Sequence, residues 1–376
     1  MKSQDSRRFR TVCAAAFATV TLGGGLLGCA SAFLQFENSA KVLENKEYDS
    51  AIQVKELEAP APVAESEEAA KTPDDSNVQP KATPKPTPKP KATPVPRAKR
   101  GAKAAAEPTP PPRRQPILED EEGFQGRRPL KDPFTVGEEV VMDISYFAVA
   151  AGELTMQTRS FAEVNGRRAY RFRAIAKTVS VFEMFYKVDD TVDILFDYET
   201  LMPFSYVLDI KESNVLRNSR AIHQWGFGTN PAVGDKPDLV QYWDKKITKD
   251  GGVEEKKIEW EAPPFSQSAF SALWYLRAFQ LTPGKKVQFY IAHENENLLI
   301  TCEVLRREEL RTKAGTFKTV VIRPTATKDG KPHNIGTNLF WVTDDDSKLM
   351  IRMETKIKIG TIVGSLSRIK RGTAQP

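Results

Sequence analysis

The sequence predicts a mainly β protein, built as a large curled antiparallel sheet or barrel-like domain of roughly a dozen strands. Three observations support this fold class. Runs rich in β-branched and aromatic residues recur at strand length, turn residues follow one another at intervals of about ten positions, and the C-terminal part alternates apolar with charged residues. One helix, at about 266–281, interrupts the strands, and a disordered proline-rich tether precedes the domain.

The N-terminus has the features of a secretory leader that ends in a lipobox, Leu26-Leu-Gly-Cys29. A basic head precedes an apolar stretch at 11–25, which is too short to span a bilayer. We therefore expect a lipoprotein signal peptide at 1–28 and a lipidated, palmitate-bearing Cys29 that anchors the protein in the cell envelope. Ala30 stands where Asp would signal retention in the inner membrane, which favours the outer membrane, facing the periplasm.

Two segments of different composition follow the lipobox. Residues 29–58 form the lipidated N-terminus, with a short helix expected within 36–58. Residues 59–116 should be a disordered linker, first acidic and then basic and Pro-rich, because proline removes backbone donors and favours an extended chain. At roughly 3.1 Å per residue, 80–116 would span on the order of 115 Å and act as a spacer. Its cations offer a second role, adhesion to anionic envelope polymers.

The predicted domain at 117–376 contains most of the strand signals. Asn165-Gly166 is a strong hairpin signal, and Asp250-Gly251 and Asp329-Gly330 mark two further turns. Near the C-terminus, apolar residues at 351, 353, 357 and 359 alternate with charged ones, which predicts a strand with one buried face. The β-rich runs are 138–146, 153–161, 169–176, 192–196, 204–210 and 287–291.

The single predicted helix has an amphipathic pattern. Phe270, Leu273, Trp274 and Arg277 fall on one face at i, i+3, i+4 and i+7, and Pro283-Gly284 end the segment. We expect this helix to plug the curled sheet or to pack against it.

Charge and cysteine content exclude several classes of protein. The net charge of +6 comes mostly from the leader and linker, so the domain is nearly neutral and no nucleic-acid partner is expected. Of three cysteines, Cys13 leaves with the leader and Cys29 is acylated. The remaining Cys302 lies in an apolar run and is interpreted as a small buried residue with no disulfide partner.

Seven stretches follow one another in a characteristic order between about 130 and 370. They are Phe134-Thr-Val-Gly-Glu138 with Tyr146 and Ala151-Gly152, Phe185-Tyr-Lys-Val-Asp189, Asp197-Tyr-Glu-Thr-Leu-Met-Pro203, Ala272-Leu-Trp-Tyr-Leu-Arg277, Ala314-Gly-Thr-Phe317, Phe340-Trp-Val-Thr-Asp-Asp345, and Ile359-Gly360 with Gly364-Ser-Leu366. In these stretches the chain resembles the bacterial exported family known as domain of unknown function 3108. The resemblance implies a periplasmic, mostly β domain and implies no reaction. The lipobox and the long linker depart from the simplest members.

The sequence contains no motif for a cofactor, a zinc site or a nucleophilic triad. The acidic run at 344–346 is interpreted as a charged hairpin turn rather than a calcium site, because calcium needs six to eight suitably spaced oxygens. Asp189 and Asp193 on one strand are the alternative to a non-catalytic role: a carboxylate pair could hydrolyse an envelope glycan. No cofactor and no metal are expected.

Aromatic residues supply the candidate ligand site. They are expected along one face of the curled sheet, either as ordinary core or as a groove for an acyl chain or hydrophobic peptide. Arg277 would need a partner, which Asp189, Glu138 or the acidic group of a ligand could supply. The candidate ligand-binding residues are Tyr146, Tyr186, Tyr206, Trp274 and Arg277.

The sequence therefore predicts a periplasmic lipoprotein with a binding or scaffolding role in the envelope and no catalysis. Its expected partners are a membrane through the lipid anchor, an anionic polymer through the linker, and a lipid or protein ligand inside the sheet.

Overall fold

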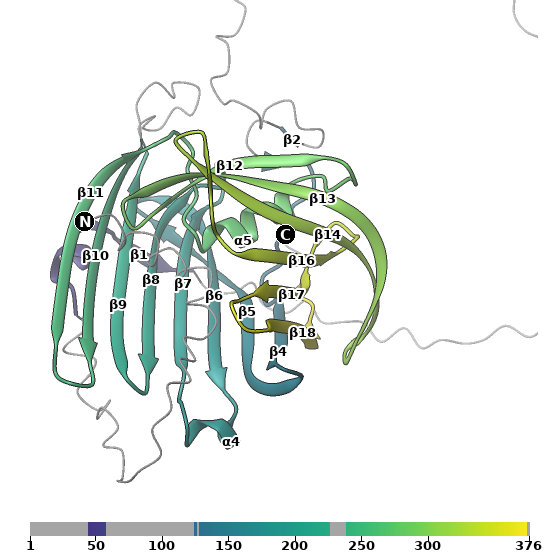
Figure 1. Cartoon of the computed structure of the whole chain (residues 1–376). Coiled ribbons are helices and arrows are strands. Elements are labelled where there is room, and N and C mark those ends of the chain that lie inside the picture. The colour runs from purple at the N-terminus through teal and green to yellow at the C-terminus, as the bar shows by residue number, and fades with distance from the viewer. Residues whose placement is uncertain (1–43, 58–123, 126–127, 226–237, 374–376) are drawn as a thin grey trace, which may run out of the picture. The chain divides into compact units, whose positions relative to one another are not determined.

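A computed structural model describes residues 44–57, 124–125, 128–225 and 238–373 (Figure 1). The expected leader at 1–28, the lipidated Cys29 and the linker at 59–116 lie outside these residues. All described residues belong to one of the two compact units of the chain, which comprises Met1–Pro60 and Arg113–Pro376. No helix in this described part is long and apolar enough to cross a membrane.

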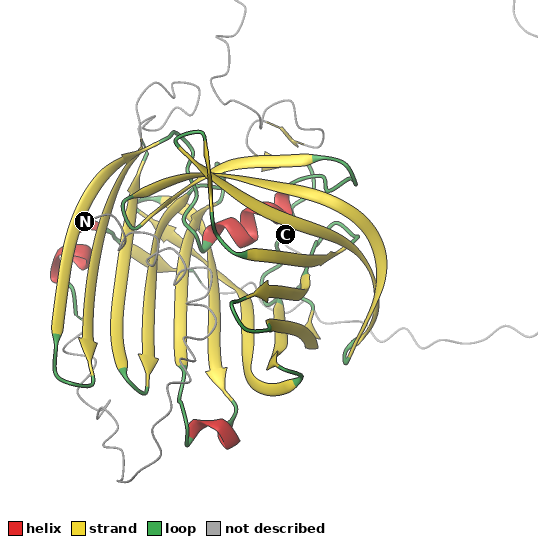
Figure 2. Ribbon diagram, in the orientation of Figure 1, coloured by secondary structure: helices red, strands yellow, loops and turns green. Residues whose placement is uncertain are grey.

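One sheet of sixteen strands dominates the unit, with all neighbouring strands along its path antiparallel, and confirms the predicted fold class (Figure 2). Its first part is a meander of hairpins: β4 (Glu139–Tyr146), β5 (Val149–Val164), β6 (Arg167–Thr178), β7 (Asp189–Asp197), β8 (Pro203–Glu212), β9 (Val215–Gln224), β10 (Asp238–Thr248) and β11 (Val253–Ala262). The second part consists of β12 (Lys286–His293), β13 (Glu296–Thr312), β14 (Gly315–Lys328), β15 (Lys331–His333), β16 (Thr337–Thr343), β17 (Met350–Lys356) and β18 (Thr361–Lys370).

The last strand joins the two parts, because β18 pairs with β4. The path across the sheet is β11-β10-β9-β8-β7-β6-β5-β4-β18-β17-β16-β14-β13-β12. A sheet of so many twisted strands does not stay flat, and this one curls until its two edge strands approach each other. Beside it, β2 (Phe124–Gln125) and β3 (Arg128–Pro129) form a separate two-stranded pair.

The segment after β11 ties the two edges together at one end. The Gln267 amide donates to the Tyr290 carbonyl at 2.8 Å, and the Ala292 amide donates to the Gln267 carbonyl at 2.8 Å. At the same end, the Trp260 indole donates to the Asn297 side chain at 3.1 Å. The sheet is therefore nearly closed into a barrel.

A short helix occupies the interior of the curl (Figure 2). It consists of α5 (Ser271–Tyr275) and a 3-10 turn, η4 (Leu276–Ala278), so it is shorter than the helix predicted at 266–281. The N-terminal part is not helical because the Gln267 backbone pairs with β12 and the Ser268 hydroxyl accepts the Ser271 amide at 2.9 Å. Trp274 is buried and stacks on Phe172, with ring centroids 4.9 Å apart.

The predicted turns are confirmed, with one correction near the C-terminus. Asn165 and Gly166 connect β5 to β6 with φ of 49° and 79°, as a primed hairpin turn requires. The alternating strand ends at Lys356, three residues before the predicted end. Ile359 therefore lies in the β17–β18 turn and is 70 % exposed, whereas the alternation placed it on a buried face.

The described N-terminal residues, 44–57, lie against part of the outer face of the sheet. The expected short helix in 36–58 corresponds to α3 (Lys46–Ala51), which the Asn45 side chain caps, and β1 (Val54–Glu56) follows it and pairs with β5. The Tyr48 hydroxyl donates to Ser205 at 3.0 Å, and Asp49 pairs with Arg220 at 2.8 Å. These contacts leave the interior of the curl to the strands and α5.

Candidate functional site

An open cavity lies inside the curled sheet between α5 and the strands β5 to β9, and its volume is about 80 Å³. Holding one water takes roughly 10–15 Å³ by the same measure, so part of a larger ligand can enter. Its apolar lining alternates along each strand, as expected for the inward face of a sheet. The strands contribute Leu154, Met156, Ala174, Ala176, Val192 and Leu208.

The helix forms the opposite wall of this cavity. Phe270, Leu273 and Trp274 line it. Phe270 and Leu273 are only half-buried although they point to the interior, as are Ala174 and Ala176 across from them. The surface that these residues present to the cavity is therefore accessible and apolar.

A charged cluster closes one side of the cavity. The Arg217 guanidinium donates through Nε and Nη2 to both oxygens of Asp244, at 2.7 and 3.0 Å, and through Nη2 to Glu294 at 2.6 Å. Tyr242 accepts from the same Nη2 at 3.0 Å. None of these bonds uses Nη1. β9, β10 and the turn after β12 thus bring together charges that are remote in sequence.

Burial and mutual attraction both affect this cluster. Burial alone would lower the pKa of Arg217, but the hydrogen bond to Asp244 and the nearby Tyr242 and Glu294 raise it above its usual value. Burial would raise the pKa of Glu294, but His293 and Arg217 lower it overall. Arg217 and Glu294 therefore remain ionised beside an apolar cavity.

Two buried histidines lie in the same interior. Burial lowers the pKa of His293 to about 4 and that of His223 to about 3, so both are neutral at physiological pH. Neither ring has a hydrogen-bond partner among the described residues. His293 lines the cavity, and its ring packs against Tyr206 and Phe270. A ligand atom in the cavity could therefore meet an unused polar group of His293.

Asp190 adds a carboxyl to the cavity wall. Burial, together with the charge of Glu212, raises the pKa of Asp190 to about 8. The carboxyl accepts the Lys211 amide at 3.0 Å. At neutral pH the group is therefore mostly protonated, which keeps this side of the cavity uncharged.

The structure brings only part of the predicted aromatic set together. Trp274 lines the cavity, and Tyr206 lies buried behind Phe270, with ring centroids 4.9 Å apart. Tyr146 lies where β4 ends and donates to the Ile359 carbonyl at 2.5 Å. Tyr186, in the connection from β6 to β7, donates to Glu212.

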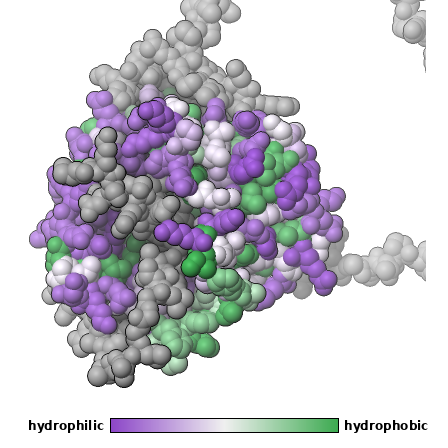
Figure 3. Space-filling model, viewed as in Figure 1, coloured by the Kyte–Doolittle hydropathy of each residue, from purple (hydrophilic) through white to green (hydrophobic). Residues whose placement is uncertain are grey.

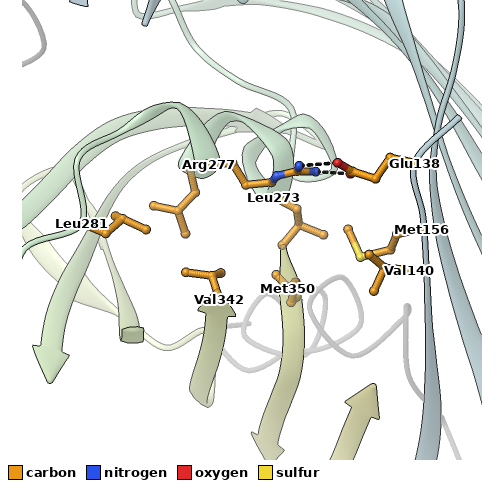
Figure 4. Close-up of a pocket in the computed structure, with 9 residues that line it drawn as sticks. Glu138, Val140, Met156, Leu273, Arg277, Leu281, Val342 and Met350 are labelled. Carbon is orange, nitrogen blue, oxygen red and sulfur yellow. Dashed lines mark hydrogen bonds and ion pairs between the residues drawn. The ribbon is translucent and has the colours of Figure 1, made fainter. Parts of the chain in front are cut away.

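Arg277 does not line this cavity but a second, smaller pocket, in which Figure 4 shows its guanidinium pointing toward Glu138. It donates to both oxygens of Glu138, at 2.7 and 2.9 Å, and to the carbonyls of Pro133 and Ser347 at 2.7 and 2.9 Å. Both side chains are 5 % exposed. Of the three partners considered from sequence, the structure selects Glu138.

The carboxylate pair of the hydrolase alternative does not face a cleft. Asp189 and Asp193 lie on the outer face of β7, where Lys177 and Arg173 pair with them at 3.3 and 2.6 Å. Four residues of extended strand separate them by ~13 Å, beyond the ~5–9.5 Å that glycosidase carboxylates need.

In the acidic run at 344–346, Asp345 accepts hydrogen bonds from the amides of Ser347 and Lys348 at 3.0 Å, as in a hairpin turn.

The family model described as "Protein of unknown function (DUF3108)" matches residues 141–367. The chain belongs to this family. The match to DUF3108 includes every strand that lines the cavity, from β5 to β17, and the helix α5. No curated protein matches the chain.

Several solved structures are similar to this DUF3108 protein at low identity. A beta-barrel-like protein of domain of unknown function DUF1849 from Brucella abortus has 12% identity and a TM-score of 0.40, covering 63% of this chain and 98% of that one. A candidate exported protein with a YmcC-like fold from Bacteroides fragilis has 10% identity and a TM-score of 0.28, covering 64% and 99%. A candidate lipoprotein from Parabacteroides distasonis has 10% identity and a TM-score of 0.29, with the same coverage.

Sequence reasoning missed Arg217, His293 and Glu294. A signal was present in β9, where Arg217, Ser219, Ala221 and His223 share one face by period two. In sequence these polar residues resemble a solvated strand face. Their inward direction is evident only from the pairing of β9 with β10 and from the contact of Arg217 with Glu294 in the turn after β12.

Proposed function

We propose that this protein binds an apolar, chain-like ligand such as a lipid acyl chain inside its curled sheet, without catalysis. The observation that carries the proposal is the open cavity whose accessible walls, β5 to β8 and α5, are mainly apolar. Burying such a wall against an acyl chain stabilises the complex by about 0.8 kcal/mol per methylene group.

The polar side of the cavity supports a ligand with a polar end. His293 offers a neutral ring without a partner, and Arg217 and Glu294 lie beside it. An ester, hydroxyl or carboxyl group placed there would satisfy His293, while the chain occupies the space between Leu154 and Leu273. This arrangement of a few polar groups at the end of an apolar pocket is typical of small-molecule sites.

The proposed location rests on the sequence. We propose that Cys29 carries the lipid anchor in the outer membrane, facing the periplasm, and that the linker at 59–116 separates the domain from it. The cations of the linker favour adhesion to anionic envelope polymers. A protein ligand with an exposed apolar segment would suit the same cavity.

The test is mass spectrometry of lipids that remain bound to the full chain after purification. Ala174→Phe places a ring in the cavity, and we expect it to reduce the bound lipid by roughly tenfold or more. The matched control is Ile175→Phe, since the neighbouring residue of β6 points to the other face. Equal lipid content in the two variants would contradict the proposal.

A further inference from the structure

One end of the curled sheet carries a concentration of exposed apolar side chains, which we call the apolar rim. It comprises Phe147, Val149, Val181, Met184, Phe185 and Ile359, each between 53% and 78% exposed. They come from the β4–β5 turn, from the connection that contains α4 (Ser180–Glu183), and from the β17–β18 turn. Figure 3 shows hydrophobic residues at the lower end of the molecule, where α4 lies in Figure 1.

The three segments of the rim are neighbours. β18, β4, β5, β6 and β7 are adjacent in the sheet, so their connections at this end follow one another. The Tyr146 hydroxyl donates to the Ile359 carbonyl at 2.5 Å, and a Cβ at Gly360 would lie 3.0 Å from the Phe147 ring. The Val179 amide donates to the Ala151 carbonyl at 3.2 Å. The rim is therefore one surface of the folded domain.

The most exposed charges next to the rim belong to lysines. Lys356 and Lys358 precede Ile359, are exposed, and have no ion-pair partner within the described part of the chain. Lys187 and Glu183 lie within the α4 connection, and Asp189 at its end pairs with Lys177. Exposed apolar and aromatic side chains bordered by lysines match the interface of an anionic bilayer, in which rings and aliphatic groups enter the headgroup layer and ammonium groups meet phosphates.

We infer that the apolar rim docks onto a membrane surface containing anionic phospholipids. A second copy of the chain is a poorer occupant, because a rim-to-rim contact would bring Lys356 and Lys358 of both copies together. The inference does not depend on the proposed cavity ligand. The two are related by position, since Ala176 and Asp190 of the cavity lie within two residues of the rim-side ends of β6 and β7. A docked rim would hold that end of the cavity against lipid.

The test is amide hydrogen exchange of the full chain reconstituted in vesicles. Vesicles of phosphatidylcholine alone are compared with vesicles in which one lipid in four is phosphatidylglycerol. We expect exchange at 147–150, 180–187 and 357–360 to slow in the anionic vesicles, and high salt to reverse the effect. Because exchange is measured at the rim segments themselves, docking of the rim is distinguished from attachment of the chain through Cys29.

Two variants and a control make this test specific. Val181→Ser with Met184→Ser and Phe185→Ser removes the apolar contact, and Lys356→Glu with Lys358→Glu reverses the charge. Each should make exchange at the rim faster by roughly tenfold in anionic vesicles. Leu130→Ser, an equally exposed residue outside the rim, should change nothing.

Equal exchange at the rim in both vesicle types and in all variants would overturn the inference. Protection that appears without lipid and grows with protein concentration would also overturn it, because a second copy would then cover the rim. Lipid retained in the cavity by a rim variant that no longer docks would leave the proposed ligand intact, so the two proposals can fail separately.

Discussion

Arg277 on the interior helix and Glu138 before β4 form a buried, bidentate ion pair, with N–O distances of 2.7 and 2.9 Å. Two backbone carbonyls accept hydrogen bonds from Nε and Nη2 of the same guanidinium. A pair so buried is costly to break, because removing one partner leaves the other charge uncompensated. The pair fixes the helix to the segment before β4, and the four bonds use four of the five N–H donors of Arg277.

Arg277→Ala should therefore lower the free energy of unfolding by roughly 3–5 kcal/mol, and adding Glu138→Gln should recover part of the loss. Arg323→Ala, which breaks the exposed pair with Glu303, is the control and should cost under about 1 kcal/mol. Urea denaturation measures all four proteins. A single variant as stable as the control would show that the pair contributes little.

His293→Phe should reduce the decrease in the free energy of unfolding that occurs as the pH falls. The pKa of His293 is about 4 in the folded protein against an ordinary 6.5, so the unfolded chain binds more protons between these values. Stability is then full above pH 6.5 and falls as the pH drops towards 4, by at most about 1.4 kcal/mol per pH unit for one histidine. Phenylalanine keeps the packing against Phe270 and Tyr206. Denaturation midpoints at pH 7, 6 and 5 measure this effect. If the midpoints of the variant change with pH as those of the wild type do, His293 does not have the lowered pKa assigned to it.

Asp190→Asn tests a pH dependence of stability that has the opposite direction to that of His293. The folded pKa of about 8 exceeds the ordinary 3.8, so folding takes up a proton in this range and stability falls as the pH rises through it. Between pH 6.5 and 8 this carboxyl should lower the stability of the wild type by up to about 2 kcal/mol. The amide variant should lose much less, whereas Asp189→Asn, which removes only the smallest cause of the shift, should keep most of the wild-type loss. Identical slopes for the two variants would count against a buried, protonated Asp190.

Much of the fold could be predicted because strand alternation and turn chemistry are local. Asn165-Gly166 specifies its hairpin by itself, and β17 shows its buried face in its spacing. The helix start could not be predicted, since the pairing of Gln267 with β12 competes with helix formation. Phe204 lies on the outer face because β8 has a β-bulge opposite Leu195 and Phe196. The two-residue alternation of a regular strand does not predict such a bulge.

The candidate site was predictable only in its aromatic part. Trp274 follows from the helix pattern, but the charged side of the cavity depends on Arg217, Asp244 and Glu294 meeting across three segments. No local spacing relates them. The partner of Arg277 was open for the same reason, because Glu138 lies 139 positions away in sequence.

Cys29→Ser should release the protein from membranes or leave an unprocessed precursor, because the proposed anchor is attached to this thiol. Metabolic labelling with a palmitate analogue measures the modification directly. Wild-type protein that takes up no label and still fractionates with membranes would rule out the lipid anchor.

The central claim is that an acyl chain occupies the cavity beside Trp274, and fluorescence quenching tests it most directly. A fatty acid brominated along its chain should quench the Trp274 component of the emission, while the unbrominated acid should not. Quenching should disappear in Trp274→Phe and weaken by roughly tenfold in Ala174→Phe but persist in Ile175→Phe. Emission that is unchanged by the brominated acid, or quenched equally in Trp274→Phe, would contradict the account.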